Sequence, residues 1–187
     1  MAEFLKLNKG SFLNLSKSEN TLEHIRVAAG WDVSNGFFNY DLDLIAQLVH
    51  SNGKIETISF ANKKGTGIEL DQDNLTGTGN SDDENINIYF NKLKETINKI
   101  NIFVNIYAAK FKFGQNFSKV KNSYVRIINE NEKREICRFE MSKDEGKHTS
   151  IKAGTFEKKG NEWIFTAVGE YGNLNLTDIE KGKNNSF

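Results

Sequence analysis

The sequence predicts an all-β protein, a β-sandwich of two mainly antiparallel sheets, and three observations favour this fold class. In residues Ile100–Ala108, aliphatic residues alternate with Asn and aromatic residues, as in a strand that is covered on one face. Shorter runs with the same period of two occur along the chain, with Gly, Asn, Asp and Ser between them. No sustained apolar stripe at helical spacing is present. Many short strands separated by polar turns are typical of a sandwich.

Each predicted strand is a short run rich in aliphatic or aromatic residues that is bounded by turn-forming residues. In chain order, the predicted strands are Leu22–Ala29, Phe37–Val49, Ile55–Phe60, Ile86–Phe90, Ile100–Ala108, Tyr124–Ile128, Ile136–Met141 and Trp163–Val168.

The best helix candidate is Asn91–Lys99, in which Leu93 and Ile97 are four residues apart. A loop that leads into the next strand is an equal alternative for this segment. The polar residues 180–187 are expected to fray. We find no linker and no low-complexity segment in the sequence, so residues 1–187 are predicted to form a single domain.

Composition sets the class of protein. The chain has 187 residues, of which 37% are hydrophobic, so a buried core is available. Lys+Arg and Asp+Glu are both 25, which removes the overall basic field of a general nucleic-acid binder. The single cysteine, Cys137, fits a reducing compartment. The N-terminal residues contain no apolar run typical of a signal peptide or a membrane span, so we expect a cytoplasmic protein.

Charge is unevenly distributed along the chain. No Lys or Arg occurs between Arg26 and Lys54, or between Lys64 and Lys92, although both segments contain carboxylates. Clustered carboxylates repel each other, and a hard divalent cation is the simplest group that offsets this repulsion.

The acidic loop between residues 71 and 84 has the chemistry of a calcium site. Ca²⁺ takes roughly six to eight oxygen ligands from carboxylates, amides and backbone carbonyls, and the loop contains no His or Cys that would indicate zinc or copper. It is not an EF-hand, because Leu75 and Thr78 occupy two of the positions that the EF-hand pattern reserves for a ligand and a glycine. An exposed acidic loop without an ion is the alternative interpretation. The residues in it that offer side-chain oxygens are Asp73, Asn74, Asp82, Asp83 and Glu84.

The segment Asp41-Leu42-Asp43 strengthens the metal hypothesis. On an extended chain, Asp41 and Asp43 point to one face while Leu42 points to the core. Asp32, at a predicted strand end, can reach the same region. Ordinary alternation plus a turn aspartate is the competing interpretation. The predicted metal ligands are therefore Asp32, Asp41, Asp43, Asp73, Asn74, Asp82, Asp83 and Glu84.

Four segments of the sequence resemble the TerD family of bacterial tellurite-resistance and general stress proteins. They are Leu7-Asn8-Lys9-Gly10 with Leu13–Lys17, Gly30-Trp31-Asp32 leading into Tyr40–Asp43, Asp73–Gly77 through Asp82-Asp83-Glu84, and Gln115-Asn116-Phe117 with Asn122, Arg126 and the late Glu162–Gly169.

The resemblance implies a β-sandwich that binds two calcium ions through the acidic segments. It also implies a role in resistance to tellurite, other chemical stress or phage, beside other proteins of the same system. Leu44 and Gln72 depart from the family's usual residues next to its two acidic motifs.

The function expected from these features is that of a calcium-organised binding or scaffold protein, and not that of an enzyme. A metal-dependent phosphoester hydrolase that uses the same carboxylates is the alternative, and a structural module that forms oligomers is a third hypothesis. No nucleic-acid partner is expected.

Six further residues carry expectations of their own. Cys137 is predicted to be a small core residue and not a nucleophile. His24, His50 and His148 lack metal-ligand spacing and are expected at the surface or on edge strands. Arg126 is predicted to pair with nearby carboxylates or to line an anion site, and Arg138 likewise.

Overall fold

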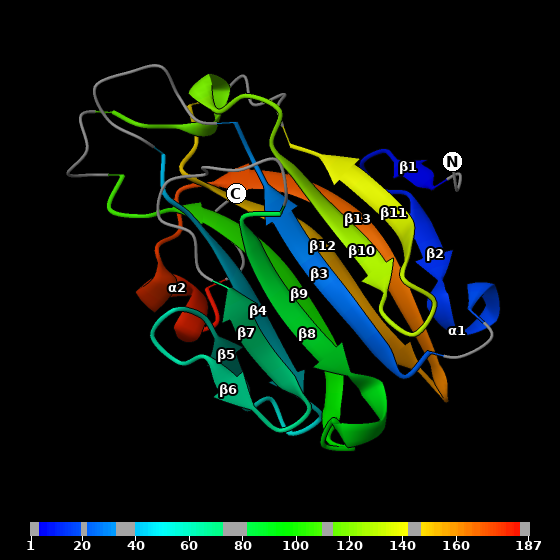
Figure 1. Ribbon diagram of the computed structural model, residues 1–187. Helices are drawn as coiled ribbons and strands as arrows, with labels where there is room; N and C mark the ends of the chain where they lie inside the picture. The colour runs from blue at the N-terminus through cyan, green and yellow to red at the C-terminus, as the bar shows by residue number, and fades with distance from the viewer. Residues whose placement is uncertain are drawn as a thin grey trace.

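The structure of the protein is a computed structural model. The structure describes residues 4–19, 22–32, 40–72, 82–109, 114–141 and 147–183 (Figure 1). None of the helices in these ranges is long and apolar enough to cross a membrane.

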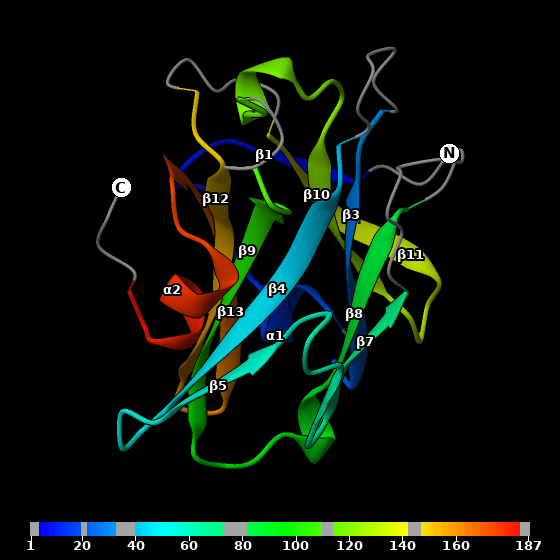
Figure 2. The same cartoon turned by 90° about the vertical axis from the view of Figure 1, so that its left-hand side faces the viewer.

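Two sheets form a sandwich, as predicted. Figure 2 shows them on opposite sides of the core, with β4, β9, β12 and β13 in one layer and β3, β8, β10 and β11 in the other. In order across the sheet, the first sheet (sheet A) contains β1 (Leu5–Leu7), β11 (Arg134–Glu140), β10 (Tyr124–Asn129), β3 (His24–Gly30), β8 (Glu84–Tyr89), β7 (Ile68–Gln72) and β6 (Lys64–Gly65). The second sheet (sheet B) contains β2 (Phe12–Asn14), β13 (Glu162–Gly172), β12 (Ser150–Lys159), β9 (Ile97–Ile106), β4 (Leu42–His50) and β5 (Ile55–Ile58).

Strand pairing is antiparallel with one exception, since β1 pairs with β11 in parallel. Strands β1 and β2 follow each other in the chain but lie at the edges of different sheets. The N-terminal segment therefore crosses from one layer of the sandwich to the other (Figure 1).

The core lies between the two sheets and follows the alternation of the strands. In β8, Ile86 and Ile88 are buried in it, and the intervening Asn85 and Asn87 bond to side chains of β3 on the outer face of sheet A. This pattern is the period of two on which the fold class was predicted.

Short helices complete the fold: α1 (Leu15–Ser18), α2 (Leu176–Glu180), and the 3-10 turns η1 (Phe90–Lys92) and η2 (Phe117–Lys119). Helix α2 covers part of the outer face of sheet B, where Leu174 and Ile179 pack on Ile45 and Phe103. Gln47, on the same face of β4, donates a hydrogen bond of 2.6 Å from Nε2 to the carbonyl oxygen of Ile179.

Asn91–Lys99 does not form the candidate helix. The chain makes only the turn η1, and the loop alternative is correct because Ile97 pairs with His50 at the start of β9 and is buried there. At the C-terminus, residues 181–183 continue α2 into a hydrogen-bonded turn, whereas fraying was expected from residue 180. The first part of the predicted strand Phe37–Val49 lies outside the described residues, and β4 accounts for the rest.

A candidate metal centre at one end of the sandwich

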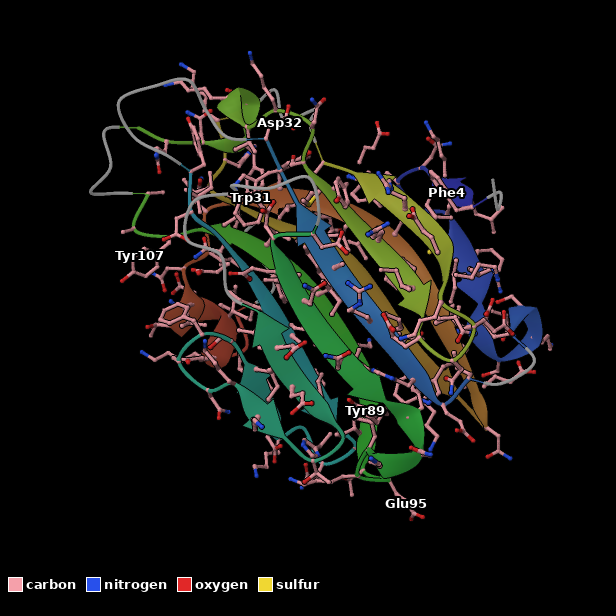
Figure 3. All side chains as sticks on the ribbon, in the orientation of Figure 1. Phe4, Trp31, Asp32, Tyr89, Glu95 and Tyr107 are labelled. Atoms are coloured by element: carbon pink, nitrogen blue, oxygen red, sulfur yellow. The ribbon has the colours of Figure 1, made fainter. Side chains whose placement is uncertain are left out.

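Five of the six buried acidic residues among those described lie where β3 ends and where β4 and β8 begin, and the sixth, Glu19, bonds to Asn129 and Arg134 elsewhere. Ala29 of β3 is the register partner of Glu84 in β8, so these two strand ends lie side by side in sheet A. Leu42 begins β4 in sheet B. Figure 3 shows Trp31 and Asp32 at this end of the molecule.

Glu84 connects the two sheets. Its side chain is buried, and Oε2 accepts a hydrogen bond of 2.5 Å from the backbone N–H of Leu44 in β4. Strand β5 pairs with β4 only from Ala46 onward, so the first residues of β4 have a neighbouring strand on one side only. The Glu84 carboxylate thus bonds to the start of β4, directly beside Asp43.

Asp83 is tied to the segment that leads into β4. Its Oδ2 accepts a hydrogen bond of 3.0 Å from the backbone N–H of Trp31. The indole Nε1 of Trp31 donates in turn to the carbonyl oxygen of Tyr40 at 3.2 Å. Asp83 is therefore connected through Trp31 to the residue that precedes Asp41.

Asp41 and Asp43 lie at the start of β4, on either side of Leu42. Leu42 is fully buried in the core, as the alternation predicted. The four carboxylates of this end are almost inaccessible to solvent, with exposed fractions of 7% for Asp41, 4% for Asp43, 2% for Asp83 and 1% for Glu84. Buried carboxylates require compensation from hydrogen bonds or cations, because desolvation disfavours the charged form.

Asp32 lies at the rim of this end and is exposed. Its Oδ2 accepts a hydrogen bond of 2.6 Å from Nδ2 of Asn122, and its backbone N–H donates to the carbonyl oxygen of Lys121 at 3.0 Å. Asn122 has a positive φ of 50°, a conformation that Asn tolerates better than most residues. These contacts hold the end of β3 against the segment before β10.

Two predicted ligands, Asp73 and Asn74, lie outside the described residues. Within the ranges that the structure describes, no group of three or more His, Cys, Asp or Glu residues is arranged to hold a metal ion. A calcium site at this end would therefore need oxygen atoms from residues 73–81, which join Gln72 to Asp82, or from the backbone.

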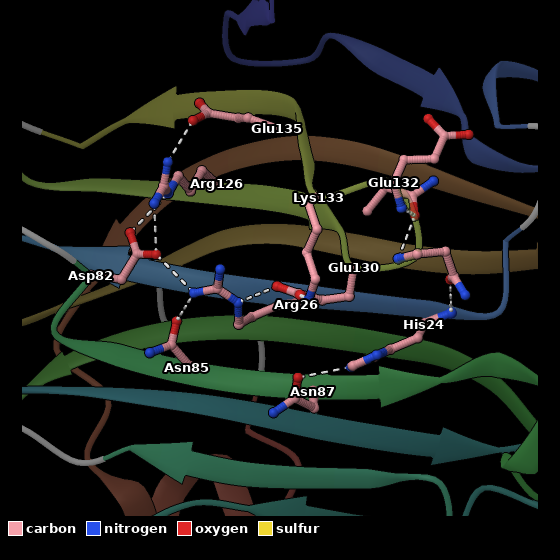
Figure 4. Close-up of polar contacts among 12 residues, drawn as sticks. His24, Arg26, Asp82, Asn85, Asn87, Arg126, Glu130, Glu132, Lys133 and Glu135 are labelled. Atoms are coloured by element: carbon pink, nitrogen blue, oxygen red, sulfur yellow. Dashed lines mark hydrogen bonds and ion pairs between the residues drawn. The ribbon is translucent and has the colours of Figure 1, made fainter. Parts of the chain in front are cut away.

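Asp82 has surroundings of a different kind (Figure 4). Its Oδ1 accepts from Nε of Arg126 at 2.8 Å and from the hydroxyl of Tyr124 at 3.0 Å. Its Oδ2 accepts from Nη2 of Arg126 at 2.8 Å and from Nη1 of Arg26 at 3.0 Å. Both oxygens are thus engaged by cations of the protein, so this geometry does not fit the predicted role of Asp82 as a metal ligand.

The network continues along the outer face of sheet A. Arg26 also bonds to Glu130, and Arg126 bonds to Glu135. Burial acts to raise the pKa of Glu135, but hydrogen bonds from Arg138 and Arg126 outweigh it and hold that pKa below its usual value. The pKa of Glu130 is likewise lowered, because the bonds from Lys133 and Arg26 outweigh the effect of burial.

Tyr124 is affected in the opposite direction. Burial, together with the adjacent charge of Asp82, raises the pKa of its phenol to about 12. The phenol therefore stays protonated and donates to Asp82 throughout the physiological range.

The family of this chain follows from its whole length. The TerD domain matches residues 4–181, which span both sheets and the acidic end. The chain belongs to the TerD family.

Known members of the family include close relatives of this chain. It is 33% identical over 173 residues to general stress protein 16U of Bacillus subtilis (strain 168), with 88% of this chain and 89% of the relative covered. It is 30% identical over 173 residues to tellurium resistance protein TerD of Serratia marcescens, with coverages of 89% and 90%.

A solved structure has the same fold. The crystal structure of a homologue of telluride resistance protein (TerD) from Streptomyces coelicolor A3(2) superposes with a TM-score of 0.71 at 19% identity, covering 86% of this chain and 96% of that chain. This likeness supports the two-sheet architecture of the TerD fold.

Several residues that surround the acidic segment were not predicted from the sequence. Arg26, Tyr124 and Glu135 were not predicted to lie near this segment. The alternation of Arg26 with the buried Ile25 and Val27 in β3 does indicate that Arg26 lies on the outer face of sheet A. For Arg126 and Arg138, the structure shows the expected pairing with carboxylates.

The predictions for cysteine and histidine had mixed outcomes. Cys137 is buried in the core, as predicted, and burial raises the pKa of its thiol to about 12. His50 was expected at the surface or on an edge strand. It is instead buried at the end of β4, between β5 and β9, where its Nδ1 lies 2.8 Å from Oγ1 of Thr96 and its Nε2 lies 3.5 Å from Oε1 of Glu56.

Proposed function

We propose that this TerD-family protein binds calcium and acts as a calcium-organised binding module in a bacterial stress response. The proposed ligands are Asp41, Asp43, Asp83 and Glu84, together with Asp73 and Asn74 and with Asp32 at the rim. The observation that carries the proposal is the burial of four carboxylates at one end of the sandwich. Glu84 bonds to Leu44 at the start of β4, and Asp83, which directly precedes β8, bonds to Trp31 after the end of β3.

The chemistry of these side chains suits Ca²⁺. Calcium prefers carboxylate and amide oxygens in flexible arrangements of roughly six to eight ligands. This set of six carboxylates and one amide is compatible with two bound ions per chain. The family resemblance implies the same number. Asp82 is left out of this set because Arg26 and Arg126 already bind both of its oxygens.

Calcium would link segments that are distant in the sequence. The ion would neutralise mutually repelling carboxylates and fix the connection between β3 and β4 against the connection between β7 and β8. A surface that forms only when the metal is bound would suit a partner protein of the same resistance system. The names of the relatives, which refer to general stress and to tellurium resistance, support a role of this kind.

Catalysis of phosphoester hydrolysis fits the site less well. Such a reaction needs a positive group that faces the phosphate beside the metal. The two arginines next to the acidic segment, Arg26 and Arg126, are bound to Asp82 on the outer face of sheet A. Turnover of a generic phosphodiester with Mg²⁺ or Mn²⁺ that is lost in Asp41→Asn would establish the hydrolase instead.

Thermal unfolding with calcium, with magnesium and with EDTA tests the calcium proposal. If calcium binds with an affinity of about 10 μM, about 1 mM of free calcium stabilises the folded protein by roughly 2.7 kcal/mol. We expect a higher melting temperature with calcium than with EDTA, and a smaller shift with magnesium. A calorimetric titration should return two ions per chain. Equal melting temperatures in all three conditions would exclude the proposed site.

Variants separate the metal site from general stability. Asp83→Asn and Asp73→Asn should each abolish most of the calcium-dependent shift. Glu95→Gln is the matched control, because Glu95 is exposed and lies at the other end of the molecule (Figure 3). A full calcium shift in both aspartate variants would show that the ligands are other residues. Light scattering with and without chelator would reveal whether calcium instead links several copies of the chain.

A further inference from the structure

Three successive rows of side chains run from the acidic end along the outer face of sheet B. The strand register places them side by side across β4, β9 and β12. Their neighbours along the strands, such as Leu44 and Val104, belong to the main core between the sheets, so the rows themselves point outward. In order from the acidic end, the rows are Asp43, Asn105 and Ser150; Ile45, Phe103 and Lys152; and Gln47, Asn101 and Thr155.

The C-terminal segment, residues 173–183, lies across these rows on the side of sheet B that faces away from sheet A (Figure 2). In the first row, Oγ of Ser150 accepts a hydrogen bond of 3.0 Å from the backbone N–H of Leu174. In the third row, Nε2 of Gln47 donates to the carbonyl oxygen of Ile179 at 2.6 Å. Between these bonds, Leu174 and Ile179 pack on the apolar pair of the second row. We call residues 173–183 the C-terminal latch.

The first two rows are buried although they lie on an outer face. The exposed fractions are 4% for Asp43, 6% for Asn105 and 0% for Ser150, and Ile45 and Phe103 are at 0% as well. Burial on an outer face requires a cover, and the latch is bonded to the first row and packed on the second. Displacement of the latch would therefore open this part of sheet B to water.

The latch depends on these contacts for its structure. Helix α2 has five residues, fewer than an isolated helix needs to be stable in water. Its docking therefore relies on the packing against Ile45 and Phe103 and on the two hydrogen bonds to sheet B. Short segments that are held by few contacts open locally, at a lower free energy than global unfolding. The docked and open forms of the latch are thus two states of one element.

The start of β4 links the latch to the candidate metal centre. Strand β5 pairs with β4 only from Ala46 onward, so the residues before it have a neighbouring strand on one side only. Glu84 bonds to the backbone of Leu44, and the latch packs on the next residue, Ile45. A calcium ion on Asp43 and Glu84 would fix the same stretch that the docked latch fixes. When two events order one stretch of chain, the first lowers the entropic cost of the second.

We propose that calcium binding at the acidic end and docking of the C-terminal latch reinforce each other through the start of β4. The inference rests on the proposed calcium site and adds a means of regulating it. Loss of calcium would open the latch more often and uncover Ile45 and Phe103. Conversely, a partner that pulled the latch away would lower the affinity for calcium, because the coupling between two binding events is reciprocal.

Amide exchange on the full chain tests the effect of calcium on the latch. With calcium at the concentration that saturates a calorimetric titration, exchange in residues 176–180 should be about fivefold slower than in EDTA. Helix α1 is the control, because it is also short and follows β2 at the edge of sheet B opposite to β5. Its exchange should change far less.

Two outcomes would overturn the coupling and leave the calcium site intact. One is unchanged exchange in α2 although the titration shows that calcium binds. The other is equal slowing in α1 and α2, which would mean that calcium acts through global stability alone. A titration that shows no binding of calcium would instead remove the proposed site and the coupling together.

Ile179→Ala tests the reverse direction. It removes the side chain that packs on Ile45 and Phe103, and it should weaken calcium binding about fivefold, since the coupling acts equally both ways. Leu93→Ala is the matched control. Leu93 also packs against the core, but it follows η1 at the end of the molecule where Figure 3 shows Glu95.

Calorimetric titration gives the calcium affinity of both variants, and circular dichroism checks their folding. Equal affinities in folded Ile179→Ala and Leu93→Ala would contradict the coupling. If Ile179→Ala does not fold, the exchange experiment on the unmodified chain decides the question.

Discussion

Adjacent residues of one acidic segment have different physical roles. Asp82 bonds to Arg26, Arg126 and Tyr124 on the outer face of sheet A, whereas Asp83 bonds to the backbone of Trp31. The arginines neutralise the Asp82 carboxylate, whereas the Asp83 carboxylate belongs to the buried acidic group at the end of the sandwich. The amino-acid composition of the segment does not distinguish the two aspartates.

The ion pair between Asp82 and Arg126 leads to a prediction about stability. Arg126→Met should lower the free energy of unfolding by about 3 kcal/mol, because it leaves the buried Asp82 and the partly buried Glu135 with fewer cationic partners. The control Lys64→Met removes an exposed pair with Glu69 and should change it by less than about 0.5 kcal/mol. Urea denaturation measures both. Similar losses of unfolding free energy in the two variants would mean that the network of ion pairs around Asp82 adds little to stability.

Cys137 should be chemically inert in the folded protein. Because burial raises the pKa of its thiol to about 12, almost no thiolate is present near neutral pH. A disulfide reagent at about pH 8 should label it very slowly in the native protein and rapidly in denaturant. Fast labelling of the native protein would show that the strand β11 opens readily.

At the scale of elements, the outer face of β4 in sheet B takes part in two separate features. Asp43, Ile45 and Gln47 follow one another at alternate positions on its outer face. Asp43 belongs to the acidic end, Ile45 packs under α2, and Gln47 bonds to the carbonyl oxygen of Ile179. The docking of α2 and the candidate metal centre thus share one strand.

The cap of α2 gives a prediction for this element. Asn175 accepts from the backbone N–H of Asp178, and the Asp178 side chain accepts from the backbone N–H of Asn175. Asn175→Ala should therefore destabilise α2 by about 1 kcal/mol and speed amide exchange in residues 176–180. Thr177→Ala, at an exposed position of the same helix, should leave exchange almost unchanged. Equal exchange in both variants would mean that packing on Ile45 and Phe103 alone holds the helix.

The strands that could be predicted from the sequence are those in which apolar and polar residues alternate regularly. Strands β4 and β9 were found because aliphatic residues recur at every second position in them, although Ile45 and Phe103 are apolar at intervening positions. Strand β12 was missed, since Gly154 and the register shift after Lys152 interrupt its alternation. Gly154 is explained only by the fold, because a Cβ there would lie 2.4 Å from the ring of Phe165.

The candidate site was predictable in part for the same reason. The alternation of Asp41, Leu42 and Asp43 placed Leu42 in the core correctly. The partners of Asp82 could not be predicted, because Arg26 and Arg126 come from strands that only the sheet order brings beside it.

At the scale of the whole molecule, the lowered pKa values of Glu130 and Glu135 predict sensitivity to acid. Between their folded pKa values and the unfolded value of 4.5, the unfolded chain binds more protons than the folded protein. The free energy of unfolding should therefore fall as the pH decreases through this window. Thermal melts in EDTA from neutral pH down to about pH 3 measure this loss. Arg126→Met should flatten the profile, and a melting temperature that is constant over the range would contradict the assignment.

The parallel pairing of β1 with β11 bears on how the chain folds. Strands β1 and β2 pair with β11 and β13, which come much later in the chain and are therefore synthesised later. Pairings between such distant parts of a sequence form slowly, because a long loop must close before any contact is gained. Leu7 and Leu13, which pack against the core in the folded protein, therefore stay uncovered until these partner strands have been made. Refolding by rapid dilution from denaturant should accordingly show a slow last phase in which the N-terminal strands pair. Before that phase, the apolar residues of these strands are available to chaperones that bind apolar segments.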